Sequence, residues 1–420
     1  MSFQQGLSGL NATSKNLAVI GNNIANANTF GTKAARAEFS DMYAAALSGA
    51  GTNNIGIGAN LVAVAQQFTQ GNISTTENPM DLAINGAGFF QVTDGKSPVM
   101  YTRNGQFKVD RDGFIVNNSQ QQLMGYAANA QGVIQPGQAV SLQLPTGGIR
   151  PSPTTETAFE LNLDSRQAVT LPAAGPQIDF NDAATYNNAT SLTVYDAKGQ
   201  QVALTYYFQK SANDTWNVYT TANGNTVAGG LGAPLPVTTI TFAADGSAPI
   251  TPATAVPFDV PATVNAQGAD TLPITGLLFD IGAGTQFGSA FSVTDVRQDG
   301  FAAGLLTAIS IEPNGIVTAR YSNGQSRPAG QIEVATFRNP QGLQPGGDNA
   351  WSRSFASGEP VTGVPGDGAL GVLQAGALEE SNVDLTGELV SMIIAQRVYQ
   401  ANAQTIKTQD QVLQTLVNLR

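Results

Sequence analysis

Residues 385–420 read LTGELVSMIIAQRVYQANAQTIKTQDQVLQTLVNLR. No Gly or Pro follows Gly387, and Asp384 or Thr386 is placed to cap the start, so the segment predicts one long helix. Its apolar residues include one row at seven-residue intervals and several neighbours of that row: Leu385, Met392, Tyr399, Ile406 and Leu413, with Leu389, Ala395, Leu416 and Val417. An apolar row of this spacing is a coiled-coil seam, which needs a partner helix.

A matching row lies at the other end of the chain, within residues 1–28. It consists of Phe3, Leu10, Leu17 and Ile24 at seven-residue spacing, with Leu7 and Ile20 beside them. Gly6, Gly9 and Gly21 would each cost an isolated helix about 1 kcal/mol relative to Ala. Two interpretations are open: a frayed helix packed on the core, or a helix that becomes ordered between subunits. The matching C-terminal row favours the second and predicts that the two ends of the chain meet.

The composition limits the kinds of partner. The chain has 420 residues, of which 42% are hydrophobic and 12% charged, with a net charge of −11 and 46 glycines. The negative charge argues against binding to nucleic acid or to an anionic membrane surface. No apolar run is long enough to span a bilayer, so no membrane insertion is expected.

No catalytic or metal-binding site is predicted. The chain has no Cys and no His, which removes thiolate sites and the commonest general base. Gly95-Lys96-Ser97 resembles the end of a P-loop but lacks the upstream glycine, and the turn at residues 110–113 lacks an EF-hand glutamate. We therefore expect no enzyme activity and no cofactor.

The N-terminus is not expected to be a cleaved signal peptide. Ala25-Asn26-Ala27 has the small-x-small form of a cleavage site. However, residues 1–7 carry no positive side chain, and the apolar run at 17–20 is too short.

The middle of the chain is predicted to be β. Residues 29–72 form a connector, with a short helix expected at 34–47 and a strand at 60–68. Beyond it, short apolar runs are separated by Asn-Gly or Asp-Gly at residues 85–86, 94–95, 104–105, 112–113, 223–224, 314–315 and 323–324, and by the turn at 196–199. Such turns are the strongest local signal for β-hairpins.

The predicted fold is therefore mainly β with α-helical termini paired as a coiled coil, and with two nested β domains inserted between them. A Pro/Thr-rich stretch at 145–157 marks a domain boundary. The predicted domains are a terminal helical domain (1–28 with 375–420), the connector, a β domain (71–150 with 298–370) and an inserted β sandwich or barrel (151–297).

Several segments resemble the flagellar rod–hook axial protein family. The N-terminal match runs from Asn16 to Thr29 and the C-terminal match from Ser381 through Asp384 and on along the last helix; residues 85–90 and 101–107 also match. The family-motif residues are Asn22, Asn23, Ile24, Ala25, Asn26, Thr29, Gly31, Lys33, Asn382, Val383 and Asp384. One departure is that Phe30 precedes Gly31, where the family places an aromatic residue after that glycine.

The resemblance implies a structural subunit of the flagellar hook, a self-assembling curved tube that acts as a universal joint between the basal-body rod and the filament. It implies a homopolymer that contacts the distal rod protein, the hook cap, the hook–filament junction proteins and the flagellar type III export machinery. It also implies a location in the hook, outside the cell, after export without a cleaved signal peptide. The alternatives are a distal rod protein of the same family and a secreted β-rich carbohydrate-binding protein.

Overall fold

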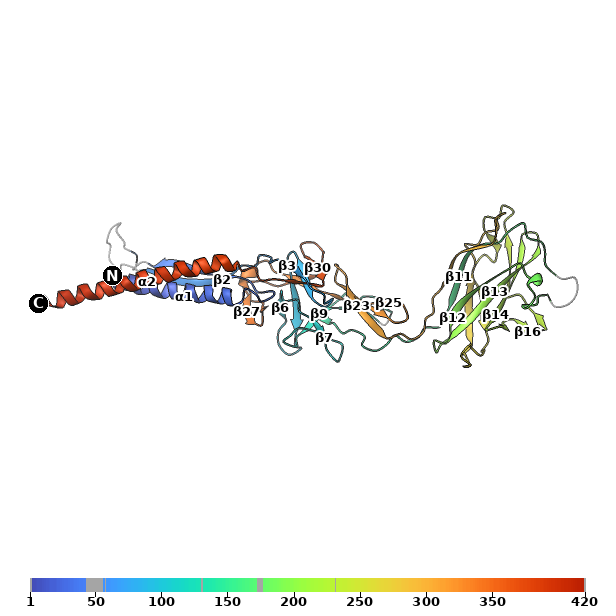
Figure 1. The fold of residues 1–420 in the computed structure, drawn as a ribbon, viewed down its shortest axis with the longest axis horizontal. Coiled ribbons are helices and arrows are strands. Elements are labelled where there is room, and N and C mark those ends of the chain that lie inside the picture. The colour runs from blue at the N-terminus through green and yellow to red at the C-terminus, as the bar shows by residue number, and fades with distance from the viewer. Residues whose placement is uncertain are drawn as a thin grey trace. The chain divides into compact units, whose positions relative to one another are not determined.

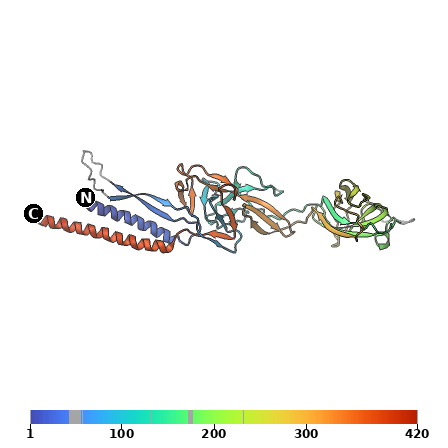
Figure 2. The same cartoon turned by 90° about the horizontal axis from the view of Figure 1, so that it is seen from above.

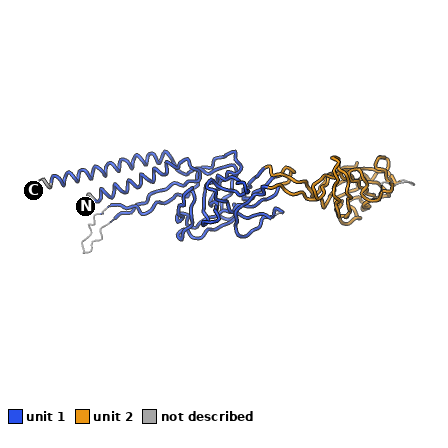
Figure 3. Tube along the Cα trace, turned by 90° about the horizontal axis from the view of Figure 1, so that it is seen from below, with its two compact units in different colours: residues 1–146, 308–320, 326–420 blue, residues 147–307, 321–325 orange. Residues whose placement is uncertain are grey.

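A computed structural model describes most of the chain: residues 2–42, 56, 58–129, 131–171, 177–230 and 232–418, with the side chains of 2, 3 and 416–418 left out. The chain divides into two compact units. Unit 1 comprises residues 1–146, 308–320 and 326–420, and unit 2 comprises residues 147–307 and 321–325 (Figure 3). The domain boundaries predicted from the sequence remain a prediction.

Both predicted terminal helices are present. Helix α1 spans Ser2–Ala25 and helix α2 spans Leu385–Asn418. They lie side by side in unit 1, with the N- and C-termini at the same end of the pair (Figures 1 and 2). Asp384 caps α2, since its carboxylate accepts a hydrogen bond from the Thr386 N–H at 3.0 Å.

The connector forms a β-hairpin of strands β1 (Ala35–Met42) and β2 (Gly58–Gln66). The predicted strand at 60–68 is confirmed. The predicted helix at 34–47 is wrong over β1, and residues 43–47 lie outside the described residues. Ala, Arg and Glu favour a helix in isolation, but here the backbone of β1 pairs with β2, and this pairing overrides a weak local preference.

The β region of unit 1 is built from short strands on both sides of the insertion. The central sheet has the order β23-β24-β25-β9-β5-β6-β28-β27, so strands far apart in sequence are neighbours. The strands are β3 (Ile73–Thr75), β4 (Leu82–Asn85), β5 (Phe89–Thr93), β6 (Met100–Thr102), β7 (Lys108–Val109), β8 (Ile115–Val116), β9 (Gln122–Ala127), β10 (Val140–Ser141), β23 (Leu306–Ile311), β24 (Ile316–Tyr321), β25 (Ser326–Ile332), β26 (Val334–Thr336), β27 (Gln344–Gly347), β28 (Ala350–Ser352), β29 (Val361–Gly363), β30 (Val372–Ala375) and β31 (Ala377–Glu379), with a 3-10 helix η2 (Pro340–Gly342).

Two apolar clusters hold this region together. One is mainly aliphatic and includes Leu82, Ile84 and Val334; the other is mainly aromatic and contains Phe89, Tyr101, Phe337 and Trp351. In the aromatic cluster the rings meet edge to face, as for Tyr101 and Phe337 at 4.7 Å between centroids.

Most of the predicted hairpins are confirmed. The turns at 94–95 and 112–113 join the paired strands β5–β6 and β7–β8, and those at 314–315 and 323–324 join β23–β24 and β24–β25. The turns at 196–199 and 223–224 join β12–β13 and β14–β15 in unit 2.

Two predicted hairpins are wrong, at residues 85–86 and 104–105. Strand β4 pairs with β30 rather than β5, and β6 pairs with β5 and β28 rather than β7. Glycine is needed here for close approach: a Cβ on Gly105 would lie 1.6 Å from the Leu82 carbonyl oxygen. In the sequence, a glycine that is required for close approach looks the same as a glycine that is required for a hairpin turn.

Unit 2 is a β sandwich, one of the two architectures predicted for the insertion. One sheet has the order β20-β21-β11-β22 and the other β12-β13-β14-β18-β19. The strands are β11 (Glu156–Asn162), β12 (Asn188–Tyr195), β13 (Gln201–Ala212), β14 (Thr215–Ala222), β15 (Asn225–Thr226), β16 (Gly229–Gly230), β17 (Ala233–Pro234), β18 (Thr238–Phe242), β19 (Pro249–Thr251), β20 (Val256–Val260), β21 (Ile274–Asp280) and β22 (Ser292–Gln298), with a 3-10 helix η1 (Ala183–Thr185).

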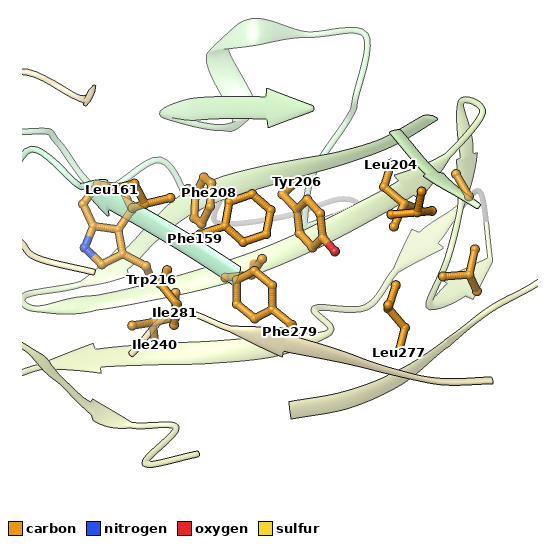
Figure 4. Close-up of a cluster of buried hydrophobic side chains, with 14 of the residues drawn as sticks. Phe159, Leu161, Leu204, Tyr206, Phe208, Trp216, Ile240, Leu277, Phe279 and Ile281 are labelled. Carbon is orange, nitrogen blue, oxygen red and sulfur yellow. The ribbon is translucent and has the colours of Figure 1, made fainter. Parts of the chain in front are cut away.

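The core of unit 2 lies between its sheets. Phe159 and Phe279 from one sheet pack on Tyr206 from the other, at 4.8 and 5.2 Å between ring centroids (Figure 4). Because this cluster includes no residue of unit 1, each unit has an apolar core of its own.

Candidate self-association surface

Helices α1 and α2 run antiparallel and approach closely through small side chains. A Cβ on Gly6 would lie 3.0 Å from Ile406 Cγ1, and one on Gly9 would lie 2.8 Å from Asn402 Nδ2. Near the other end of the pair, Asn23 Nδ2 donates to Glu388 Oε1 at 2.8 Å. Glycine at these two positions therefore lets the helices approach more closely than larger residues would.

The buried face of α1 has heptad spacing, but its buried residues other than Ile20 are small or polar. Gly6, Thr13 and Ile20 are buried and stand seven residues apart, and Asn23 is buried three residues beyond Ile20. The side of α2 that faces α1 likewise combines polar, small and apolar residues. Its less exposed residues include Glu388, Met392, Ala395, Asn402, Ile406 and Gln409. The two helices therefore contact each other through a seam that an apolar pattern alone does not identify.

The predicted apolar row of α1 is mostly not part of this seam. Ile20 is buried, whereas Leu7 is 45% exposed and Leu10, Leu17 and Ile24 are half-buried. The side chain of Phe3 lies outside the described residues. Gly6 and Gly9 lie against α2, and of the described apolar row only Ile20 is buried.

The predicted row of α2 is divided between the seam and the surface. Met392 and Ile406 are half-buried and Ala395 is buried against α1. Leu385, Leu389, Tyr399 and Leu413 are exposed, and the side chains of Leu416 and Val417 lie outside the described residues. A further set of exposed apolar residues was not singled out from the sequence: Val390, Ile393, Ile394, Val398 and Val412. Val390, Ile393, Ile394 and Val398 follow the i, i+3, i+4, i+8 spacing of one helix face, and Val412 falls on the same side of α2.

Leu413 has no part of α1 opposite it. Ile406 faces Gly6, from which α1 continues only to Ser2, whereas α2 continues from Ile406 to Asn418. Leu413 is 54% exposed, on the same side of α2 as Ile406. The last turns of α2 therefore present apolar side chains without a partner among the described residues.

The connector hairpin packs along α1 through polar contacts. Ser8 Oγ donates to the Ala59 carbonyl at 2.6 Å and accepts from the Ala59 N–H at 2.9 Å. Gln5 Nε2 donates to the Gly56 carbonyl at 2.6 Å. The hairpin thus covers part of the polar face of α1.

Two motif asparagines fix the start of the hairpin. Asn23 Oδ1 accepts from the Ala35 N–H at 2.9 Å while its Nδ2 donates to the Ala35 carbonyl at 2.8 Å. Asn382 Oδ1 accepts from the Ala34 N–H at 2.7 Å, and its Nδ2 donates to the Gln67 carbonyl at 2.7 Å. Each amide acts as donor and acceptor at once, which explains why Asn suits both positions.

The remaining motif residues lie at the ends of the two helices. Asn22 and Ala25 stand in the last turn of α1, and Asn26, which follows the helix, donates from Nδ2 to the Asn22 carbonyl at 3.0 Å. The Thr29 carbonyl accepts from the Thr32 N–H at 3.3 Å. Gly31 has a φ of +73°, and Val383 precedes the cap Asp384.

Phe30, the departure from the family pattern, has its carbonyl hydrogen-bonded to Asn349 Nδ2 at 3.2 Å. The connector is therefore held to the β region at this point through the backbone of Phe30.

A buried charge cluster joins the helical end of unit 1 to its β region. Glu379 accepts from Lys33 Nζ at 2.5 Å and from Arg103 Nη1 at 2.8 Å, and all three side chains are at most 6% exposed. The Gly71 N–H donates to the same carboxylate at 2.9 Å, and the Gly31 N–H donates to the Glu379 carbonyl at 2.8 Å. One residue thus binds four segments of the chain.

Burial lowers the pKa of the Lys33 ammonium, while the adjacent carboxylate of Glu379 acts in the opposite direction. From the sequence, Glu379 and Glu380 are expected to favour the dipole of the last helix, which they precede; the structure instead buries Glu379 in the charge cluster. The sequence offered one signal for this buried role: Glu379 directly follows the apolar residues Ala377 and Leu378 in a chain with few charged residues.

Among the described residues, no three His, Cys, Asp or Glu side chains come together as a group that would hold a metal ion. No described helix is long and apolar enough to cross a membrane.

Comparison with family models matches four parts of the chain. The matched families are "Flagella basal body rod protein" (residues 3–33), "Flagellar hook protein FlgE/F/G D1 domain" (83–199), "Flagellar basal body protein FlaE D2 domain" (162–301) and "Flagellar basal body rod FlgEFG protein C-terminal" (374–419).

Individual relatives match over the whole chain. It is 39% identical to the flagellar hook protein FlgE of Escherichia coli (strain K12) and 40% identical to that of Salmonella typhimurium, each over 100% of both chains. FlgE of Borreliella burgdorferi is 32% identical over 100% of this chain and 99% of its own.

A solved structure supports the fold. The crystal structure of Helicobacter pylori FlgE2 gives a TM-score of 0.52 at 15% identity, covering 73% of this chain and 99% of the other. Because the matched relatives carry the name of the hook protein over their full lengths, the distal-rod and carbohydrate-binding alternatives are not favoured. The chain belongs to the flagellar hook protein family and is a structural subunit of the hook, with a location in the flagellar hook or basal body.

Proposed function

We propose that copies of this chain join through the apolar side chains left uncovered on α1 and α2, and that these helices form the inner wall of the hook tube. The observation that carries the proposal is the exposed apolar surface of α2, with Ile394 57% and Leu413 54% exposed. An isolated helix pair with so much apolar surface in water is stabilised when neighbouring copies cover it.

A groove on the helix pair supports the same proposal. Thr13 and Asn16 of α1 and Ala395 and Val398 of α2 line a cavity of about 260 Å³. Small residues on α1 leave this space, and the exposed Ile394 lies at its edge. An apolar side chain of an adjacent copy would fill it, as a knob fills a hole in a coiled coil.

The remaining parts of the function rest on the family. The subunit has no enzymatic role and binds no cofactor. Its partners, besides itself, are the distal rod protein, the hook cap, the hook–filament junction proteins and the flagellar type III export machinery. It reaches the hook through that machinery without a cleaved signal peptide, and the assembled tube bends while it transmits torque.

Leu413→Asp tests the proposed surface. The side chain is exposed in the single chain, so the monomer should melt at an unchanged temperature. In the polymer a carboxylate within an apolar contact costs at least about 2 kcal/mol per subunit, and every subunit repeats that cost. We expect tubes, observed by negative-stain microscopy and sedimentation, to be absent.

Gln411→Asp is the control, because Gln411 is exposed on another side of the same helical turns. Normal tubes from Leu413→Asp, or equal loss from both variants, would contradict the proposed surface. Failure of the unaltered chain to form tubes would contradict self-assembly itself.

A further inference from the structure

Phe355 is displayed to solvent more completely than any other large apolar side chain that the structure describes, with a relative exposure of 106%. It follows strand β28 in unit 1 and stands in a turn over residues 355–357. Single apolar residues at a surface are common, so exposure alone carries no function. What distinguishes Phe355 is how firmly its turn is held.

The turn is fixed by hydrogen bonds on both sides of Phe355. Ser354 Oγ donates to the Gly342 carbonyl at 2.5 Å and accepts from the Ala356 N–H at 3.1 Å. The buried Ser357 closes the turn, since its Oγ donates to the Ser354 carbonyl at 2.8 Å and accepts from the Ser354 N–H at 2.9 Å.

Two further contacts fasten the turn to the body of unit 1. Asn339 Nδ2 donates to the Ala356 carbonyl at 3.1 Å, and Arg353 pairs with Glu359 across the base of the turn. There is no space for a side chain at Gly342, where a Cβ would lie 2.5 Å from the carbonyl carbon of Ala356. A rigid aromatic side chain loses little conformational entropy on binding, as an interface anchor requires.

Unit 1 also contains a pocket suited to an aromatic ring. It has a volume of about 230 Å³. Phe68 and Phe89 line it together with Ala87, Pro340 and Arg103, and the lining is completed by Gln70, Gly86, Gly88 and Thr336. A cavity of about 150 Å³ lined by apolar side chains holds a benzene molecule, so this pocket has room for a phenyl ring.

We propose that Phe355 of one copy inserts into the Phe68–Phe89 pocket of a second copy. The proposal rests on self-assembly as the function and names one contact within it. The rigid turn holds Phe355 out into solvent, which prevents it from filling the pocket of its own chain. An insertion that is not reciprocated between the same two copies is a head-to-tail contact, which repeats from copy to copy and extends a polymer.

The absence of cysteine in all 420 residues allows a direct test. Phe355→Cys and Ala87→Cys place one thiol on the turn and one at the exposed rim of the pocket. Tubes of the double variant, assembled at high protein concentration and oxidised, should give a ladder of covalent multimers. Either single variant alone should give none. An absence of cross-links in intact tubes, or dimers that do not extend, would overturn the proposal.

Phe355→Ser supplies a second readout. Because the side chain is fully exposed in the part of the chain that the structure describes, the melting temperature of the monomer should not change. The protein concentration required for assembly should rise tenfold or more. Ile250→Ser is the matched control, since Ile250 is 60% exposed in unit 2, and should assemble as the parent does.

Unchanged assembly of Phe355→Ser, or an equal effect of Ile250→Ser, would overturn the Phe355 contact. Self-assembly would still stand, because the unaltered chain would form tubes in the same experiment.

Discussion

At the scale of single residues, the buried Glu379 is central to the stability of unit 1. Its carboxylate is surrounded by Lys33, Arg103 and the Gly71 N–H, with no access to water. A buried ion pair adds little net stability over apolar packing, but removal of one partner leaves an uncompensated charge. Because both Lys33 and Arg103 pair with Glu379, loss of this carboxylate should destabilise the cluster more than loss of either cation.

Glu379→Gln should destabilise unit 1 by about 3–5 kcal/mol, because two buried cations would lose their only carboxylate among the described residues. Glu38→Gln breaks the exposed pair with Arg36 and should cost about 1 kcal/mol or less. Calorimetry would separate the two variants by the melting transition of unit 1. Similar shifts from both would contradict the role of the buried cluster.

At the scale of elements, the α1–α2 contact depends on small residues. Gly6 and Gly9 were expected to weaken α1, and as an isolated helix it would indeed be weakened. In the structure the same residues allow Ile406 and Asn402 of α2 to approach. The intrinsic cost of glycine in the helix is thus offset by the packing of α2 against α1.

Gly9→Leu tests this packing. Its side chain would collide with Asn402 and push the helices apart, at a cost of about 1–3 kcal/mol, typical of overpacking. Gly21→Leu is the control, because a Cβ there meets nothing within 4 Å and leucine improves helix propensity. Helical circular dichroism of the monomer on heating should show earlier melting for Gly9→Leu only. Equal stability of the two variants would argue against the close contact.

At the scale of the whole molecule, the insertion of unit 2 between parts of unit 1 explains the order of the sequence. The chain leaves unit 1 after Thr146 and returns at Ala308. The outgoing and returning segments lie beside each other, with Ile149 bridged to Gly304 and Ser152 to Phe301. Two separate cores follow from this arrangement.

Deletion of residues 148–304, with Gly147 joined to Leu305, should leave unit 1 folded. The two ends are already adjacent, since a Cβ on Gly148 would lie 2.5 Å from the Gly304 carbonyl oxygen. The loss of the hydrogen bond from Asn323 to the Ala302 carbonyl should cost about 1 kcal/mol. Calorimetry should retain one cooperative transition and microscopy should still show tubes; disappearance of that transition would show that the units depend on each other.

The sequence by itself determined the helical ends, most of the hairpins and the family. These features are local or periodic: a seven-residue apolar row, an Asn-Gly pair or a motif around Asn23 and Asn382 is visible within a few residues. The residues of the motif could be recognised in this way, but the contacts they make could not.

Only the tertiary structure decided which faces meet. An apolar pattern marks side chains that avoid water, but it does not say whether the same chain or another copy covers them. In α1, Leu7 is exposed and Leu10 and Leu17 are only half-buried, while Gly6 and Gly9 lie against α2, because close approach of two backbones favours small residues. The same reason explains three other features that the sequence did not reveal: the β1 strand, the two wrongly predicted hairpins and the Lys33–Glu379–Arg103 cluster. Each depends on segments far apart in the chain, whose packing energy exceeds the local preference that a sequence reveals.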